Sequence, residues 1–261
     1  MTSAPYTVLD QPMAGVVRLS LARPDSLNAL SSEMMEDLLA RLQHIARDPH
    51  CRVLVLAAQG KAFSAGHDLR EMRTHPDLAF YQNLFAQCSR LMVALQQLPQ
   101  PVIAQIQGIA TAAGCQLVAM CDLAVASSTA RFAVSGINYG LFCSTPSVAL
   151  SRNVGRKKAM EMLLTGDFID AAQAEREGLI NLSVAPEQLE QAVTQLCQKI
   201  VAKPPASVRL GKALFYQQLE LGIAAAYQLA GQTMACNMMD EAAQEGFQAF
   251  LDKREIGRAH V

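Results

Sequence analysis

Two short apolar runs, each followed by a loop of small residues, constrain the fold of this chain more than any other feature. The runs are residues 52–58 (RVLVLAA) and 102–106 (VIAQI). A strand that is apolar on both faces is typical of a parallel sheet covered by helices. The loops that follow are 63–69 (FSAGHDL) and 108–117 (GIATAAGCQL). The sequence therefore predicts an α/β core in which both loops lie at the carboxyl ends of strands, where open α/β folds bind ligands.

The rest of the chain divides into an alternating part and a helical part. Before residue 146, strands are expected at 14–22, 123–126 and 131–133, and helices from Ser31-Ser32 onward, from 76 to 98 and after Gly114. After residue 146, the pattern predicts helices at 147–152, 156–164, 170–177, 187–202 and 206–253, with one strand at 180–184. The predicted class is α/β with a mainly helical last third.

The composition excludes several classes of protein. The chain has 22 Lys and Arg against 23 Asp and Glu and a hydrophobic fraction of 51%, so neither disorder nor nucleic-acid binding is expected. Its seven cysteines form no CxxC pair, which favours a reducing compartment over a disulfide framework or a zinc site. No signal peptide or membrane span is evident, so a cytoplasmic location is expected. A charged fraction of only 17% indicates surface covered by other subunits.

The two small-residue loops offer backbone rather than side-chain chemistry. Gly and Ala let a ligand approach the backbone closely, and the second loop opens a helix whose first N–H groups have no partner within the helix. One N–H from each loop can form an oxyanion hole, a pair of donors for a carbonyl oxygen that acquires negative charge. Gly-Ala turns also occur where a helix simply packs closely on a sheet, so the pair of loops is stronger evidence than either loop alone.

Together with other segments, these loops resemble the enoyl-CoA hydratase/isomerase family, whose members are also called crotonases. Within the family, residues 111–122 and 140–146 are most similar to one particular subgroup. The chain is therefore identified as a member of this family along nearly its whole length. The matching segments are Arg23-Pro24, Asn28–Leu30, Lys61–Leu69, Met120–Ala126, Ala159–Gly166, Ala171–Leu179 and Glu245–Arg254.

The resemblance implies a fold, an assembly and a ligand. The fold would be a crotonase-like spiral of ββα repeats over residues 1–200, followed over residues 201–261 by a helical region that builds homotrimers, often paired into hexamers. The ligand would be an acyl-CoA thioester, so CoA enters as part of the substrate and no separate cofactor or metal is expected. The family's shared intermediate is a thioester enolate held in an oxyanion hole.

The resemblance also implies roles for individual residues. The backbone N–H groups of His67 and Ala113 match the two oxyanion-hole donors of the family. Part of the first loop matches the segment that holds the adenine and pantetheine parts of CoA. The substrate-binding positions are Ala65, Asp68, Leu69 and Gly114.

Two positions depart from the family's hydratases, which use a pair of glutamates as acid and base on a water molecule. The first glutamate position is Gln116 here, and the second is Gly136. A glutamine amide positions water through hydrogen bonds but exchanges no proton at pH 7, and a glycine has no side chain to do either. The oxyanion hole survives because backbone atoms form it. Ordinary enoyl-CoA hydration is therefore not expected.

Other side chains near the loops have alternative interpretations. His67 titrates near neutrality, yet its family role is through its backbone, and its side chain is expected to face CoA or solvent. Cys143 and Ser144 are candidate nucleophiles without a readable base, so packing by Cys143 and helix capping by Ser144 are expected instead. Asp122 is expected to make structural hydrogen bonds at the start of a strand.

Three functions remain open on the sequence. The first is an enzyme that acts on a CoA thioester through the oxyanion hole, for example by decarboxylation or thioester hydrolysis. The second is a non-catalytic acyl-CoA-binding or regulatory protein, and the third is a weak enoyl-CoA hydratase or isomerase. Measuring the binding of CoA thioesters together with their turnover separates the three.

Overall fold

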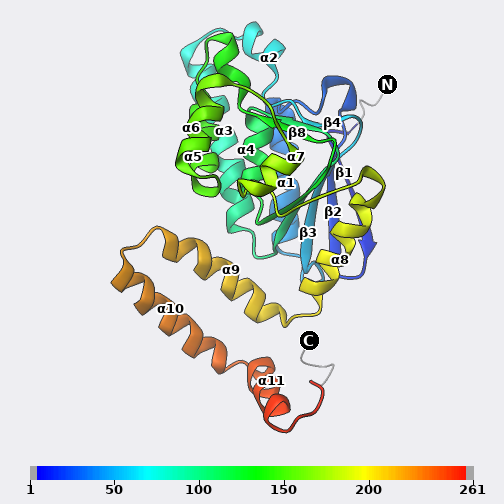
Figure 1. Cartoon of the computed structure of the whole chain (residues 1–261), viewed down its shortest axis with the longest axis vertical. Helices are drawn as coiled ribbons and strands as arrows, with labels where there is room; N and C mark the ends of the chain where they lie inside the picture. The colour runs from blue at the N-terminus through cyan, green and yellow to red at the C-terminus, as the bar shows by residue number, and fades with distance from the viewer. Residues whose placement is uncertain (1–4, 257–261) are drawn as a thin grey trace.

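The computed structural model describes residues 5–256, which form two layers of strands with helices around them (Figure 1). The larger sheet has the strand order β1-β2-β3-β5-β7-β10, in which β1 is antiparallel to β2 and the later pairs are parallel. The smaller sheet has the order β4-β6-β8-β9. The strands are β1 (Thr7–Met13), β2 (Val16–Leu21), β3 (Val53–Ala58), β4 (Ala62–Ser64), β5 (Val102–Ile106), β6 (Ile109–Thr111), β7 (Leu123–Ser127), β8 (Arg131–Ala133), β9 (Ile169–Asp170) and β10 (Leu182–Val184).

The chain passes from the larger sheet to the smaller one three times in succession, from β3 to β4, from β5 to β6 and from β7 to β8. Helices follow each of these pairs, in the third case after a short 3-10 turn, which produces repeated strand–strand–helix units. The spiral of ββα repeats implied by the resemblance is thereby confirmed. The helices of this part are α1 (Ser32–Ala46), α2 (Leu69–Thr74), α3 (Leu78–Gln97), α4 (Ala113–Met120), α5 (Ser144–Asn153), α6 (Arg156–Thr165), α7 (Ala171–Arg176) and α8 (Leu189–Val201), with short 3-10 turns at Pro24–Ser26, Ser135–Tyr139 and Pro186–Gln188.

Strand β3, which the apolar run at 52–58 forms, is buried on both of its faces. Successive side chains of a strand point to opposite faces of the sheet. Leu54 and Leu56 enter the main core, whereas Val53 and Val55 enter a second core formed with the apolar face of α8. The prediction of a parallel strand buried on both faces is therefore confirmed.

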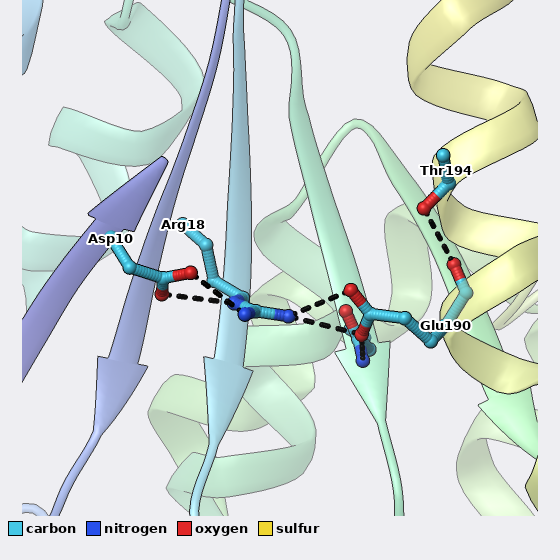
Figure 2. A network of polar contacts seen from close by, with 5 residues as sticks. Asp10, Arg18, Glu190 and Thr194 are labelled. Carbon is cyan, nitrogen blue, oxygen red and sulfur yellow. Dashed lines mark hydrogen bonds and ion pairs between the residues drawn. The ribbon is translucent and has the colours of Figure 1, made fainter. Parts of the chain in front are cut away.

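A polar network attaches α8 to the larger sheet (Figure 2). Arg18 on β2 pairs with Asp10 on β1 at 2.7 Å and with Glu190 on α8 at 2.8 Å. Gln105 on β5 donates a further hydrogen bond to Glu190, and the Thr194 hydroxyl donates to the Glu190 carbonyl. Because the carboxylate side chains of Asp10 and Glu190 are 42% and 56% exposed, each ion pair contributes at most about 1 kcal/mol. The network therefore orients α8, while the apolar core beneath it supplies most of the stabilisation.

The single helix expected over 206–253 is wrong, because three helices occupy this stretch. They are α9 (Pro205–Leu219), α10 (Ile223–Met238) and α11 (Glu241–Leu251). Gly222 is the N-cap of α10, and Asp240 caps α11 by accepting a hydrogen bond from the Ala242 N–H. In Figure 1 these three helices extend away from the strand layers as an arm. The predicted boundary at residue 200 between the core and the helical C-terminal region stays a prediction. Residues 1–4 of the first region and 257–261 of the second lie outside the described part of the chain.

Candidate active site

The two small-residue loops meet because their strands are neighbours. Strand β4 pairs in parallel with β6, so the residues that follow each strand leave the same edge of the smaller sheet. A methyl group built on Gly66 would lie 2.9 Å from the Ala112 Cβ and 3.1 Å from the Ala113 nitrogen. One built on Gly114 would lie 2.2 Å from the Ser64 carbonyl oxygen. Glycine is therefore required at both positions for the loops to approach each other.

Helix α4 begins at Ala113, the residue predicted to carry one oxyanion-hole donor. The preceding Ala112 has φ 52° and ψ −122°, a conformation that non-glycine residues rarely adopt. Its N–H donates to the Ala133 carbonyl on β8 at 3.0 Å, and its carbonyl accepts from the Gln116 N–H at 3.1 Å. Among residues 5–256, no hydrogen bond uses the N–H of His67 or Ala113. Both groups are therefore available to a ligand.

A cavity of about 250 Å³ is lined by His67 and Ala113, the residues that carry these two N–H groups. His67, Ala112 and Ala113 line it on the loop side, and Gly136 and Cys143 line it on the side of the following segment. No Asp, Glu, Lys or Arg of the described residues lines this cavity. The sequence did not predict most of the apolar residues that line this cavity. They come from elements that approach the two loops only in the folded structure, and no local sequence pattern indicates that approach. These residues are Met72, Phe85, Tyr139, Leu141, Phe142 and Pro146.

A second, more open cleft of about 850 Å³ adjoins the cavity. The two share Ala65, His67 and Leu69, so the first loop separates them. The open cleft also includes Arg23 and Arg70, which give it cationic groups that the cavity lacks. The Asp68 carboxylate lines the cleft but accepts hydrogen bonds from the N–H groups of Arg70 and Glu71, which makes it the N-cap of α2.

The His67 side chain lies against the protein rather than in solvent. Its Nδ1 lies 3.3 Å from the Leu30 carbonyl oxygen, so Nδ1 carries the proton, and its ring contacts Phe85 edge-on at 5.5 Å. Its Nε2 is buried and has no hydrogen-bond partner among the described residues. Burial lowers the pKa of His67 below its usual value of 6.5, although the Leu30 carbonyl and Glu71 act in the opposite direction. The ring is therefore neutral at pH 7.

The two glutamate positions of the family differ in how they lie in this chain. The Gln116 side chain is buried, and its Oε1 lies 4.0 Å from the Cys88 thiol on α3. At Gly136, a methyl group would lie 2.6 Å from the Leu141 carbonyl oxygen and 2.8 Å from the Cys143 sulfur. The space that a second acidic side chain would need is thus filled by the segment that follows.

Cys143 is buried, as expected of a packing residue, and its sulfur accepts a hydrogen bond from the Gly136 N–H at 3.3 Å. Burial raises the pKa of its thiol, which opposes a role as a nucleophile. The prediction that Ser144 caps a helix is wrong. Ser144 is the first residue of α5, the N-cap is Cys143 without a side-chain bond, and the Ser144 hydroxyl donates to the Phe142 carbonyl.

Asp122 makes the structural hydrogen bonds predicted for it. Its Oδ2 accepts from the Val102 N–H at 2.6 Å and from the Lys212 ammonium at 2.7 Å, and its Oδ1 accepts from the Tyr216 hydroxyl at 2.8 Å. Because Lys212 and Tyr216 lie on α9, Asp122 connects the C-terminal arm to the strand core. It lies outside the residues that line the cavity.

Two further properties of the described residues bear on possible ligands. Within residues 5–256, no group of three His, Cys, Asp or Glu side chains is placed to hold a metal ion. None of the helices described there has the length and apolar character needed to cross a membrane.

The spiral of strands and the cavity between its loops define an α/β protein with a crotonase fold. A model of the enoyl-CoA hydratase/isomerase family matches residues 11–257, and the chain belongs to this family. The enoyl-CoA hydratase domain-containing protein 3, mitochondrial, of Rattus norvegicus is 43% identical over 258 residues, which are 99% of this chain and 86% of the relative. The subgroup indicated by residues 111–122 and 140–146 is that of these proteins, and the prediction is confirmed.

Solved structures agree with the sequence relatives. A crystal structure of an enoyl-CoA hydratase from Mycobacterium smegmatis has a TM-score of 0.96 at 58% identity, and the match covers 97% of this chain and 99% of that one. The crystal structure of human enoyl coenzyme A hydratase domain-containing protein 3 has a TM-score of 0.93 at 41% identity, covering 97% of this chain and 100% of that one. The predicted fold is therefore confirmed over nearly the whole chain.

Proposed function

We propose that this chain binds an acyl-CoA thioester and stabilises the enolate of its acyl group through the backbone N–H groups of His67 and Ala113. The observation that carries the proposal is that both residues border one apolar cavity while neither N–H has a described partner. An enolate concentrates negative charge on the thioester oxygen, and two fixed donors in an apolar cavity stabilise such charge strongly. This backbone chemistry needs neither of the missing glutamates.

The open cleft beside the cavity suits the CoA part of the ligand. CoA carries phosphates, and the guanidinium groups of Arg23 and Arg70 are the groups of the cleft that can pair with them. The cleft also includes Asp25 and Asp68, and the Asp68 carboxylate is occupied as the N-cap of α2. The acyl group then enters the cavity past Ala65 and Leu69, which border both spaces. Because no cationic side chain of the described residues lines the cavity, a neutral acyl group fits it better than a carboxylated one such as malonyl.

Calorimetry combined with hydrogen exchange tests this function. We expect butyryl-CoA to bind, and the protein to speed the exchange of its α-hydrogen for deuterium by about 10²-fold over buffer. Hydroxide or buffer base from solvent takes the α-proton, and stabilising the enolate lowers the barrier to this step. Mass spectrometry of the recovered thioester measures the exchange. Binding without exchange would support the alternative of a non-catalytic acyl-CoA-binding or regulatory protein. No binding of butyryl-, crotonyl- or malonyl-CoA would refute both functions.

Restoring the two glutamates separates a weak hydratase from a reshaped site. We expect the double variant Gln116→Glu, Gly136→Glu to hydrate crotonyl-CoA no better than the unmodified protein, because a Cβ at position 136 overlaps the Leu141 oxygen and the Cys143 sulfur. Each working acid or base would otherwise contribute roughly 10²–10⁴-fold. The assay is the loss of the enoyl absorbance, with Gln116→Glu alone as the control. A gain of about 100-fold or more would show a hydratase that has only lost its acids.

We further propose that the chain forms homotrimers, which pair into hexamers in some conditions, through the helical arm. Large apolar side chains on α9–α11 are exposed in the isolated chain, among them Phe215, Ile223, Tyr227 and Phe250 at 56%, 75%, 74% and 80%. Monomeric proteins rarely expose so many large apolar side chains on one region. Sedimentation of the purified protein tests the assembly. The cytoplasmic location stays a prediction, and the rat and human relatives carry the word mitochondrial in their names.

A further inference from the structure

Ala112 combines a strained backbone with a position between the two loops. Its φ of 52° and ψ of −122° belong to the first central position of a type II′ turn, which glycine normally occupies. An alanine there is disfavoured because its Cβ crowds the backbone. Such strain persists only where the surrounding structure fixes it, and it is concentrated at functional sites.

The surrounding hydrogen bonds hold both loops on either side of the Ala112 methyl group. The Ala112 N–H bonds to Ala133 at 3.0 Å and its carbonyl accepts from Gln116 at 3.1 Å, so its peptide groups are fixed by β8 and α4. On the other loop, the Gly66 carbonyl accepts from the Leu30 N–H at 2.8 Å. The methyl group therefore lies between two anchored segments.

The methyl group also fills the space beside Gly66. A carbon built on Gly66 would lie only 2.9 Å from the Ala112 Cβ, so the methyl lies against this glycine. The peptide that follows Gly66 carries the His67 N–H, and the peptide that follows Ala112 carries the Ala113 N–H. A shift at this contact changes the distance between the two donors directly.

We propose that the Ala112 methyl group is a spacer that sets the separation of the His67 and Ala113 N–H groups, which makes Ala112 a positioning residue of the site. This inference rests on the proposed function, because the spacing affects a ligand only if both groups donate to one oxygen. The strain is retained because the spacer requires a Cβ at a position where glycine would be more stable.

The test compares Ala112→Gly with the unmodified protein by binding two thioesters. Acetoacetyl-CoA forms a stable enolate, whereas butyryl-CoA binds mainly as the neutral thioester and forms its enolate only transiently. We expect Ala112→Gly to bind acetoacetyl-CoA about tenfold more weakly and butyryl-CoA equally well, since mispositioned donors lose mainly the interaction with the charged oxygen. We also expect the midpoint of thermal unfolding to rise by roughly 2–4 °C, because the strain is released.

Lys253→Gly is the matched control, because Lys253 also has a positive φ of 55° but lies beyond the end of α11. We expect this control to leave the ratio of the two affinities unchanged. Unchanged affinities in Ala112→Gly, or equal losses for both thioesters, would overturn the spacer role. If the unmodified protein binds neither thioester, the proposed function fails. In that case, crystal structures of the unmodified protein and of Ala112→Gly test the spacer role. An unchanged distance between the His67 and Ala113 nitrogens would refute it.

Discussion

Replacing Gly114 with alanine is expected to destabilise the protein by about 3 kcal/mol and to abolish acyl-CoA binding. The added methyl group would lie 2.2 Å from the carbonyl oxygen of Ser64 and 2.9 Å from the Ser64 Cβ. Neither neighbour yields easily, because Ser64 is fully buried on β4 and its hydroxyl donates to the Asn28 carbonyl. The start of α4 must therefore move away from the smaller sheet.

That movement explains why binding and stability are expected to fall together. The Ala113 N–H belongs to the same turn, so its displacement removes one of the two proposed donors from the cavity. Urea unfolding measures the change in free energy, and calorimetry with butyryl-CoA measures binding. Gly211→Ala is the control, since nothing lies within 4 Å of a Cβ at this position inside α9. It should stabilise the protein by up to about 1 kcal/mol. A Gly114→Ala protein with normal stability would contradict the close approach of α4 to β4.

Much of the fold could be predicted because its elements carry strong local patterns. The run 52–58 and the helix from Ser31 onward have the expected burial and capping, the latter with the Ser31 hydroxyl accepting from the Met34 N–H. Apart from β8, which is expected at 131–133, the strands of the smaller sheet could not be predicted from periodicity, because β4, β6 and β9 contain only two or three residues each. A strand of that length is too short to show an alternating pattern. The pairing of β4 with β6, which brings the two loops together, depends on tertiary structure alone.

Some features of the candidate site could likewise be predicted from the sequence, and others could not. The two loops with His67 and Ala113 are readable as motifs, and the structure brings them to one cavity. The obstruction at Gly136 could not be predicted from the sequence, because it arises from the carbonyl oxygen of the residue five positions later and the sulfur of the residue seven positions later. Sequence alone therefore describes Gly136 as a lost acid. The geometry adds that the space for an acid is occupied.

Replacing Lys212 with methionine is expected to cost 3–5 kcal/mol, about the value of breaking a buried ion pair by removing one partner. The Lys212 side chain is 7% exposed and that of Asp122 14%, and their charged atoms are 2.7 Å apart. The ammonium also donates to the carbonyls of Leu95 at 3.1 Å and Gln100 at 2.9 Å. Methionine has a similar length but no donor. The Asp122 carboxylate therefore loses its counter-ion and keeps only the Val102 N–H and the Tyr216 hydroxyl, and two carbonyl oxygens lose a donor.

A matched control separates burial from charge. Lys158→Met breaks a pair of similar length, 2.8 Å from Glu161. The Lys158 side chain is 13% exposed, but the Glu161 side chain that the variant retains is 60% exposed. It is expected to cost less than about 0.5 kcal/mol, since water replaces an exposed partner. Urea unfolding of both variants gives the two free energies. Equal small losses would show that the Lys212 pair adds nothing beyond a surface ion pair.

The double variant Lys212→Met, Asp122→Asn shows what this ion pair does for the fold. Burial lowers the pKa of Lys212 even though Asp122 raises it, so the attraction offsets only part of the cost of removing the ammonium from water. Removing both charges should therefore cost about 1–3 kcal/mol less than the sum of the two single losses. Because α9 contains no fully buried residue in the single chain, Lys212 and Tyr216 fix the arm mainly through polar contacts to Asp122. Near-normal stability of the double variant together with altered sedimentation would show that the buried pair mainly orients the arm for assembly. Unchanged sedimentation would show that the pair contributes to stability alone.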